Sequence, residues 1–346
     1  MSHWLTNNFP EYRQRSSLCP SPIMAALRSL ESQGIEPQHL QGHWRLPLAT
    51  LRQPFLRLPS FLARRFWEVA LELSNDPALG LAAARHVDPG QLLGLGYLMQ
   101  LMPTRLEALV VMLEFWPLLA GHVDLRLEQH EGRVHLSLHP GAGVLPAPEE
   151  VDYWVSRQIQ FLRSWVCASD ALLEVRLRRP PPVEPQPWHT LSQKPVYFGT
   201  EHNELVLDQA ALQEQRPGGS LSIRQALDDA LHEYVRHTAT PSVLESVSAA
   251  VMQELRGELS LEVLAKRLHT TPRTLHRALL RDGWSFVDII EFHRRYLAHD
   301  LLQANEMSVA QIADHLGYSE VRSFTRAFRR WYADTPSQFR ARHNPR

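Results

Sequence analysis

Apolar residues follow two different spacings along the first part of the chain. Between residues 21 and 119 they recur mostly every three or four positions, as in FLARRFWEVALEL and RLEALVVMLEFW, which predicts helices. Between residues 122 and 140, in HVDLRLEQHEGRVHLSLHP, they alternate with polar residues on both sides of a turn containing glycine. This alternation predicts an antiparallel β-hairpin.

The pattern continues with one more helix and several short strands. We expect the helix in VDYWVSRQIQFLRSWV and the strands in LLEVRLRR, PVYF and ELVLD. The proline-rich stretch RPPPVEPQP should be an extended loop, because proline fixes φ and donates no backbone hydrogen bond. A mixed α/β domain follows, with an antiparallel sheet covered by helices.

The last third of the chain has a helical pattern throughout. After an expected helix at 223–237, every segment from Pro241 onward has helical spacing. We therefore predict three parts: a flexible end over residues 1–20, a mixed α/β domain over 21–238, and an all-α domain over 239–346.

Two segments of the all-α domain repeat each other. LAKRLHTTPRTLHRAL aligns with IADHLGYSEVRSFTRAF, with one residue added in the turn of the second copy. Each copy has a short helix with a small residue at its centre, a turn, and a second helix, which is the layout of a helix-turn-helix. We expect these motifs at about 260–281 and 308–331, joined by a linker helix in SFVDIIEFHRRYLAHDLLQ.

Capping and turn residues support these boundaries. Side chains suited to N-caps precede the expected helices, namely Ser260, Thr271, Ser308, Ser319 and Thr335. Gly317 tolerates positive φ in the turn of the second motif. His269 occupies the corresponding turn of the first motif, where positive φ is less favourable.

The second helix of each motif has an apolar face and a polar face. In the first copy, the residues that should point inward are Leu275, Ala278 and Leu279. In the second copy, the residues that should point inward or partly inward are Val321, Phe324, Phe328 and Trp331. The polar face then carries Arg273, Thr274, His276 and Arg277 in the first copy and Glu320, Arg322, Ser323, Arg326 and Arg330 in the second.

Such side chains can form hydrogen bonds with base edges and phosphates. Two helices about 34 Å apart on one side of a protein would enter successive major grooves of DNA. The alternative is that these are solvated faces of an ordinary helical bundle. The repeat favours the DNA-binding interpretation.

Charge changes the picture only locally. The chain has a net charge of -1 and a pI near 7, so it has no overall signature of nucleic-acid binding. From Pro241 onward there are 15 Lys and Arg residues against 12 Asp and Glu, a charge of +3, while the remainder has 21 against 25, a charge of -4. This asymmetry is mild, and it points to the all-α domain.

We expect a soluble cytoplasmic protein that does not enter a membrane. The N-terminal residues lack the apolar segment of a signal peptide, and the most apolar stretch, ALVVMLEFWPLLAG, is too short to span a bilayer.

Cys19 and Cys167 cannot build a disulfide framework, and Cys167 is interpreted as a core thiol. GLG at residues 94–96 lacks the third glycine and the preceding strand of a dinucleotide-binding motif.

No residue pattern favours an enzyme. The pairs His39 and His43, and His135 and His139, have no nearby residues to complete a metal site. A nucleophile elbow and a P-loop are also missing from the sequence. We therefore expect no catalytic residues, no metal and no cofactor.

The residues from Ser260 to Arg340 resemble the DNA-binding domain of AraC/XylS-type transcription regulators. LAKRLHTTPRTLHRALLRDGWSF and IADHLGYSEVRSFTRAFRRWYADTPSQFR carry the resemblance. Ala333 departs from it, because the family usually has glycine there. The resemblance implies that His276, Arg277, Arg322, Ser323 and Arg326 contact bases or nearby phosphates, with Arg273 and Thr274 as neighbours. Backbone amides at the helix starts near Ser260 and Ser308 would hold phosphates.

The preceding part resembles the effector-binding domain of the AraC subgroup with a mixed α/β sensor rather than a cupin barrel. The resemblance is carried by DPALGLAAARHVDPGQLLGLGYLMQLMPTRLEALVVM and KPVYFGTEHNELVLD. It implies an unidentified small-molecule effector, a homodimer formed through this domain, and an activator that works with RNA polymerase.

The sequence thus predicts a sequence-specific transcription regulator that binds promoter DNA and responds to a ligand. A different class of function stays open at this point. The chain could be a non-catalytic sensor or protein-interaction module whose helix-turn-helix motifs bind protein instead of DNA.

Overall fold

The computed structural model describes residues 15–44, 46–53, 55–87, 92–141, 144–165, 169–215, 219–255 and 259–343. Cys167 lies outside these residues, as does the side chain of His43. The chain forms two compact units. The first contains the chain up to Thr240 except residues 143–145, and the second contains residues 143–145 and the chain from Pro241 to the end.

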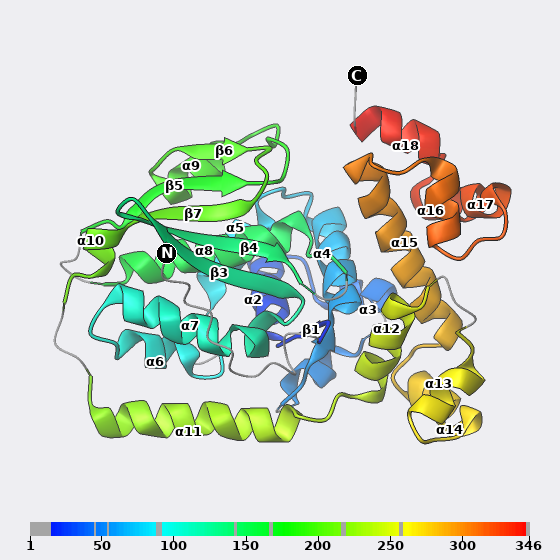
Figure 1. Ribbon diagram of the computed structural model, residues 1–346, viewed down its shortest axis with the longest axis horizontal. Helices are drawn as coiled ribbons and strands as arrows, with labels where there is room; N and C mark the ends of the chain where they lie inside the picture. The colour runs from blue at the N-terminus through cyan, green and yellow to red at the C-terminus, as the bar shows by residue number, and fades with distance from the viewer. Residues whose placement is uncertain are drawn as a thin grey trace. The chain divides into compact units, whose positions relative to one another are not determined.

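A five-stranded sheet lies at the centre of the first unit (Figure 1). Its strands, in spatial order, are β3 (Val123–His130), β4 (Arg133–Pro140), β7 (Asn203–Asp208), β5 (Leu172–Leu177) and β6 (Val196–Phe198). Neighbouring strands are antiparallel except β5 and β6, which are parallel. The predicted hairpin is confirmed as β3 and β4, in a mixed α/β unit.

The two faces of this sheet differ in polarity. Leu125, Leu136 and Leu205 are buried on one face, which helices α7 (Arg105–Ala120) and α8 (Pro148–Arg163) cover. On the other face Glu204 accepts hydrogen bonds at 2.9 Å from both Arg176 and His135. A sheet with one solvated face is typical of antiparallel pairing, and it explains the alternation in the sequence.

The helices of the first unit are α2 (Ser21–Ser32), α3 (Gln38–Trp44), α4 (Ser60–Ser74), α5 (Leu79–Ala83), α6 (Leu95–Gln100), α7 (Arg105–Ala120), α8 (Pro148–Arg163), α9 (Gln186–Ser192), α10 (Gln209–Leu212) and α11 (Leu221–Thr238). The 3-10 helices η1 (Leu48–Arg52) and η2 (Ala84–His86) also occur among the described residues. Gly80 allows α5 and α8 to meet, because a Cβ there would lie 2.0 Å from the carbonyl oxygen of Glu149.

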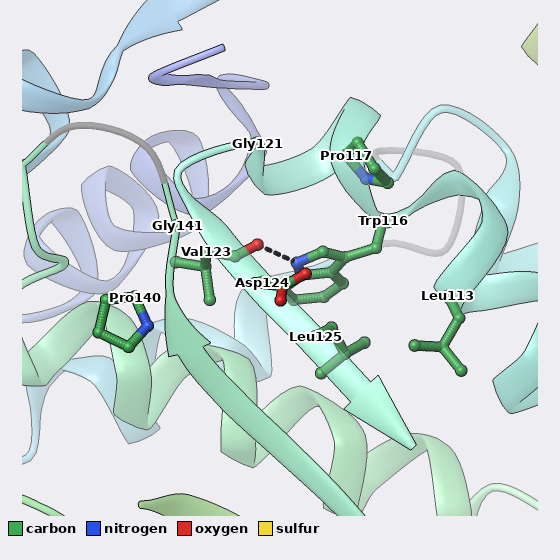
Figure 2. Close-up of a pocket in the computed structure, with 9 residues that line it drawn as sticks. All are labelled: Leu113, Trp116, Pro117, Gly121, Val123, Asp124, Leu125, Pro140 and Gly141. Atoms are coloured by element: carbon green, nitrogen blue, oxygen red, sulfur yellow. Dashed lines mark hydrogen bonds between the residues drawn. The ribbon is translucent and has the colours of Figure 1, made fainter. Parts of the chain in front are cut away.

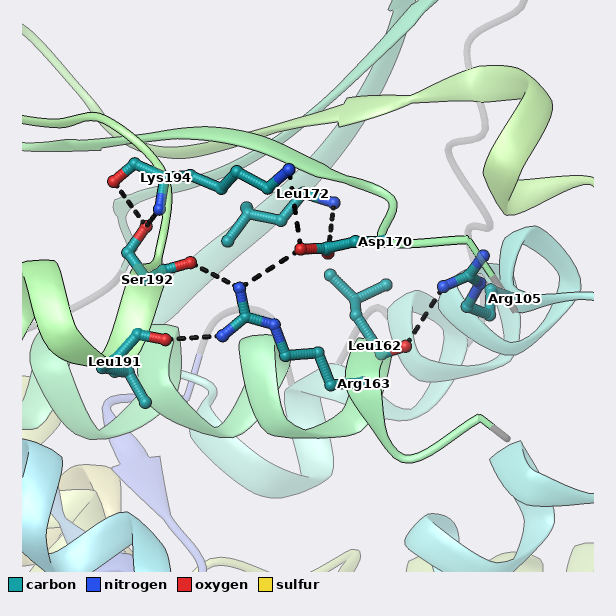
Figure 3. A network of polar contacts seen from close by, with 8 residues as sticks. All are labelled: Arg105, Leu162, Arg163, Asp170, Leu172, Leu191, Ser192 and Lys194. Atoms are coloured by element: carbon teal, nitrogen blue, oxygen red, sulfur yellow. Dashed lines mark hydrogen bonds and ion pairs between the residues drawn. The ribbon is translucent and has the colours of Figure 1, made fainter. Parts of the chain in front are cut away.

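Arginine side chains tie helix ends to neighbouring segments (Figure 3). The buried Arg105 donates to the carbonyl oxygens of Leu162 at 3.2 Å and Ala211 at 2.7 Å. Arg163 donates to the Leu191 carbonyl at 2.5 Å and also bonds the Ser192 carbonyl. These bonds satisfy carbonyl groups that have no partner within their own helices.

Two details differ from the prediction. Within the segment expected to be a flexible end, residues 15–19 are buried, and β1 (Ser17–Leu18) pairs with β2 (Leu58–Pro59). Pairs this short leave no periodic signal. The proline-rich loop ends at Pro185, since α9 begins at Gln186, and proline is tolerated in the first turn of a helix.

The second unit is all-helical, as predicted. It contains α12 (Val243–Gln253), α13 (Leu261–Arg267), α14 (Pro272–Arg281), α15 (Phe286–Ala304), α16 (Val309–His315), α17 (Val321–Tyr332) and α18 (Pro336–His343). On α15, His293 is buried with its Nε2 2.9 Å from the Ser248 hydroxyl on α12. Burial lowers the pKa of His293 to about 3, so the ring is neutral at pH 7.

Candidate nucleic-acid interface

The first helix-turn-helix is formed by α13 and α14. The Ser260 hydroxyl accepts a hydrogen bond from the Val263 amide at 3.3 Å and caps α13, while Thr271 caps α14. The buried Ala265 leaves room for the two helices to pack together. In the turn His269 has a φ of 50°, the left-handed conformation that the alignment with Gly317 predicts.

The second helix-turn-helix is formed by α16 and α17. Ser308 and Gln311 form the predicted capping box at the start of α16. Gly317 has a φ of 73° in the turn. Phe324 and Phe328 are fully buried and anchor α17 to the core of this half of the unit.

Helix α15 joins the two motifs and is also bonded to the second one. Arg294 donates to the Gly317 carbonyl at 3.3 Å, and its guanidinium lies 4.8 Å from the centre of the Tyr318 ring. A cation over an aromatic face is stabilised by the ring quadrupole. The linker helix thus holds the turn that sets the direction of α17.

The predicted contact residues of α14 lie on its exposed face. All four are exposed: Arg273, Thr274, His276 and Arg277. The Thr274 hydroxyl lies 2.9 Å from that of Thr271, so it also supports the cap. Within the described parts of the chain the other three side chains have no hydrogen-bond or ion-pair partner.

The predicted contact residues of α17 differ more among themselves. Glu320, Arg322, Arg326 and Arg330 are exposed, and Ser323 is half-buried. Arg322 and Arg326 have no polar partner among the described residues. Both are therefore available to bind an external acceptor.

Arg330 is already paired. Glu291 on α15 accepts hydrogen bonds from Arg330 at 2.6 Å and from the Trp331 indole at 2.9 Å. Partial burial alone would raise the pKa of Glu291, but the bonds from Trp331 and Arg330 outweigh it and lower the pKa. Glu291 is a residue of this surface that the sequence did not reveal, because nothing in its local pattern links it to a residue so far along the chain.

Two expectations for the start of α17 were wrong. The N-cap position is Glu320, without a side-chain cap bond, and Ser319 precedes it. Val321, expected to point inward or partly inward, is 41% exposed. Since the helix begins one residue later than expected, its first turn faces solvent.

A groove separates α15 and α17. It has a volume of about 250 Å³, and its walls include Arg294, Arg326 and Arg330 with Glu291 and Tyr318.

The hydroxyls of Ser260 and Ser308 accept amide hydrogen bonds within their own helices. Contacts of these two helix starts with phosphate remain a prediction.

This unit has two helix-turn-helix motifs, and their second helices carry cations that lack a partner in the described chain. This arrangement is typical of a class of DNA-binding proteins. A family model described as the arabinose-binding domain of AraC transcription regulator, N-terminal, matches residues 34–215, and a helix-turn-helix domain model matches residues 264–342. The first match covers more than half of the chain. The chain therefore belongs to the AraC family of transcription regulators.

Individual relatives agree with this assignment. The ornithine utilization regulator of Pseudomonas aeruginosa is 26% identical over 354 residues, 94% of this chain and 97% of that protein. An HTH-type transcriptional regulator of Mycobacterium bovis is 31% identical over 150 residues, 42% of this chain and 43% of the relative. VirS of Mycobacterium tuberculosis is 42% identical over 85 residues, 25% of each chain. The chain thus matches less than half the length of the last two relatives.

Among solved structures, the transcriptional regulator CdpR of Pseudomonas aeruginosa aligns over 92% of this chain and 98% of its own, with 19% identity and a TM-score of 0.46.

Among the helices of the described segments, none combines the length and apolar character needed to cross a bilayer.

Proposed function

We propose that this regulator binds promoter DNA with α14 and α17 in successive major grooves. The observation that carries the proposal is the set of exposed arginines on both helices that lack a partner in the described chain, Arg273, Arg277, Arg322 and Arg326. Arginine can donate two hydrogen bonds to guanine, and cations near phosphates release counterions from DNA.

Further parts of the proposal concern regulation. The first unit binds a small-molecule effector and forms the contact of a homodimer. The regulator works in the cytoplasm as an activator together with RNA polymerase. A relative in Escherichia coli is named as the urease operon transcriptional activator, which supports activation as the mode of action. An effector changes DNA affinity by binding one arrangement of the protein better than another.

The test is genome-wide capture of DNA by the purified protein, followed by footprinting of the strongest fragment. We expect protection of about 20 base pairs per protomer, which is two helical turns. Arg326→Ala should cost about 1–3 kcal/mol of specific binding. Arg277→Ala should weaken protection of the other half of the site.

Arg133→Ala is the matched control, because Arg133 is an exposed arginine on the sheet of the first unit. Its footprint should equal that of the unmodified protein. Equal binding by Arg326→Ala across all sequences would remove Arg326 from the reading surface. Absence of any sequence-selective protection, with and without cell extract as a source of effector, would favour the protein-interaction module instead.

A further inference from the structure

Two of the hollows among the described residues of the first unit differ in their polar groups. The larger, of about 300 Å³, lies between the end of α7 and the edge strand β3 (Figure 2). Its polar side chains are already paired: the Trp116 indole donates to the Val123 carbonyl at 2.8 Å, and Asp124 pairs with Arg126 at 2.9 Å. Among the described residues that line this hollow, each polar side chain therefore already has a hydrogen-bond partner.

The smaller cavity lies between α6, α7 and α8. Its walls on α6 and α7 are apolar and include Leu95, Met99, Met112 and Leu119. Methionine side chains are flexible and adapt to ligands of different shape. The volume of this cavity is about 30 Å³, enough for a molecule the size of water.

Helix α8 contributes one polar stripe to the same cavity. Trp154, Arg157, Gln158 and Phe161 all line it, and their spacing of three, four and seven residues places them on one face of the helix. Trp154 is 2% exposed and Gln158 is 7% exposed.

Three polar atoms of this stripe are buried without a hydrogen-bond partner in the described chain: Trp154 Nε1, Arg157 Nε and Gln158 Oε1. The Arg157 guanidinium bonds only neutral groups among the described residues, Gln160 Oε1 at 3.0 Å and the Ala84 carbonyl at 3.5 Å. Burial lowers the pKa of Arg157, and the group that opposes this shift is Tyr153 rather than a carboxylate. Two of the three atoms, Arg157 Nε and Trp154 Nε1, are donors, and a half-buried cation beside an unpaired donor favours an anionic partner.

We propose that this cavity binds a monocarboxylate with a short apolar body. The carboxylate accepts hydrogen bonds from Arg157 and the Trp154 indole, and the apolar body packs against the methionine and leucine side chains of α6 and α7. The inference rests on the proposed function in one respect, since it names the chemical class of the effector.

Helix α6 must move outward to admit such a molecule, because the cavity now holds only a water-sized one. The helix has six residues, and Leu93 and Gly94 before it have left-handed backbone angles, with φ of 57° and 79°. It also contacts α11 (Figure 1). The Leu101 carbonyl just after α6 accepts a hydrogen bond from the Gly219 amide at 3.2 Å, just before α11.

Helix α11 ends at Thr238, and the second unit begins at Pro241. Displacement of α6 therefore reaches the segment that connects the two units. A ligand that binds only the displaced state shifts the population toward it, and this gives the sensor a physical route to the DNA-binding unit.

Titration calorimetry on the full chain with three probes that share one body tests the class of ligand. Hexanoate should bind at least about tenfold more tightly than hexanamide or hexylamine, because only hexanoate carries a negative charge that can pair with the Arg157 guanidinium. Arg157→Gln should remove this preference. Arg157→Lys should retain most of it, and Arg133→Gln, a change of an exposed arginine, should leave it unchanged.

Met112→Trp should block hexanoate by filling the cavity while leaving Arg157 in place. Equal binding of all three probes, or equal hexanoate binding by Arg157→Gln, would overturn the proposal. No heat of binding with hexanoate up to about 10 mM would mean that the cavity holds water only, and would overturn it as well.

Footprinting of the same variants with and without hexanoate separates this proposal from the DNA-binding one. Acid binding with no footprint in either condition refutes the proposed function alone. A normal footprint without acid binding refutes the effector class alone.

Discussion

Replacing Gly317 by alanine should destabilise the second unit more than an ordinary loop substitution does. Gly317 has a φ of 73°, which costs an alanine about 1–2 kcal/mol. A Cβ at this position would also lie 2.3 Å from the carbonyl oxygen of Leu255, a backbone atom that cannot rotate away. Overpacking of this kind costs about 1–3 kcal/mol. The expected loss is therefore about 2–5 kcal/mol in total.

Hydrogen exchange followed by mass spectrometry is the suitable assay, because it reports on each unit of the full chain separately. Gly317→Ala should lower the protection of slowly exchanging amides in α13 to α17 by at least about thirtyfold, which corresponds to about 2 kcal/mol. Amides of the five-stranded sheet should be unaffected.

Gly132→Ala provides the control. Gly132 has a φ of 75° in the β3–β4 turn, but a Cβ added there would have no atom within 4 Å beyond its chain neighbours. Gly132→Ala should therefore lose only the stability that a left-handed backbone costs an alanine, about 1–2 kcal/mol. This loss should appear in the first unit. If Gly317→Ala costs no more than Gly132→Ala, the contact with Leu255 does not constrain the turn and the reasoning is refuted.

Three more outcomes are expected in the second unit. Glu291→Gln should free Arg330 for a phosphate and steepen the slope of log K against log salt by about 0.9, and the same slope in both proteins would contradict this. Because burial lowers the pKa of His293 to about 3, the unfolded chain takes up the proton first as pH falls. In urea titrations, the free energy of unfolding should therefore be highest above about pH 6.5 and fall by about 1.4 kcal/mol per pH unit down to pH 3. A pH dependence unchanged in His293→Gln would exclude this residue as the cause. Ala333, with a φ of 56°, stands where glycine relieves strain, so Ala333→Gly should raise stability by about 0.5 kcal/mol, and a lower melting temperature would count against it.

Much of the second unit could be predicted because its signals are local. The repeat of two short helices depends on spacing, caps and turn residues that lie within a few positions of one another. Ser260, Thr271 and Ser308 cap their helices as expected, and the left-handed angles of His269 and Gly317 follow from their aligned turns. The start of α17 was misplaced because Ser319 and Glu320 are both polar and only packing distinguishes them.

By itself, the sequence determined the class of each unit, the hairpin, the two helix-turn-helix motifs and the polar side chains that face outward, because alternation and helical spacing are properties of neighbouring residues. Only the tertiary structure decided which of these side chains are free. It placed Glu291 against Arg330, and it buried polar atoms of Arg157 and Trp154 without a partner in the described chain, beside an apolar wall. Pairing and burial depend on residues that are distant along the chain and meet only when the helices pack.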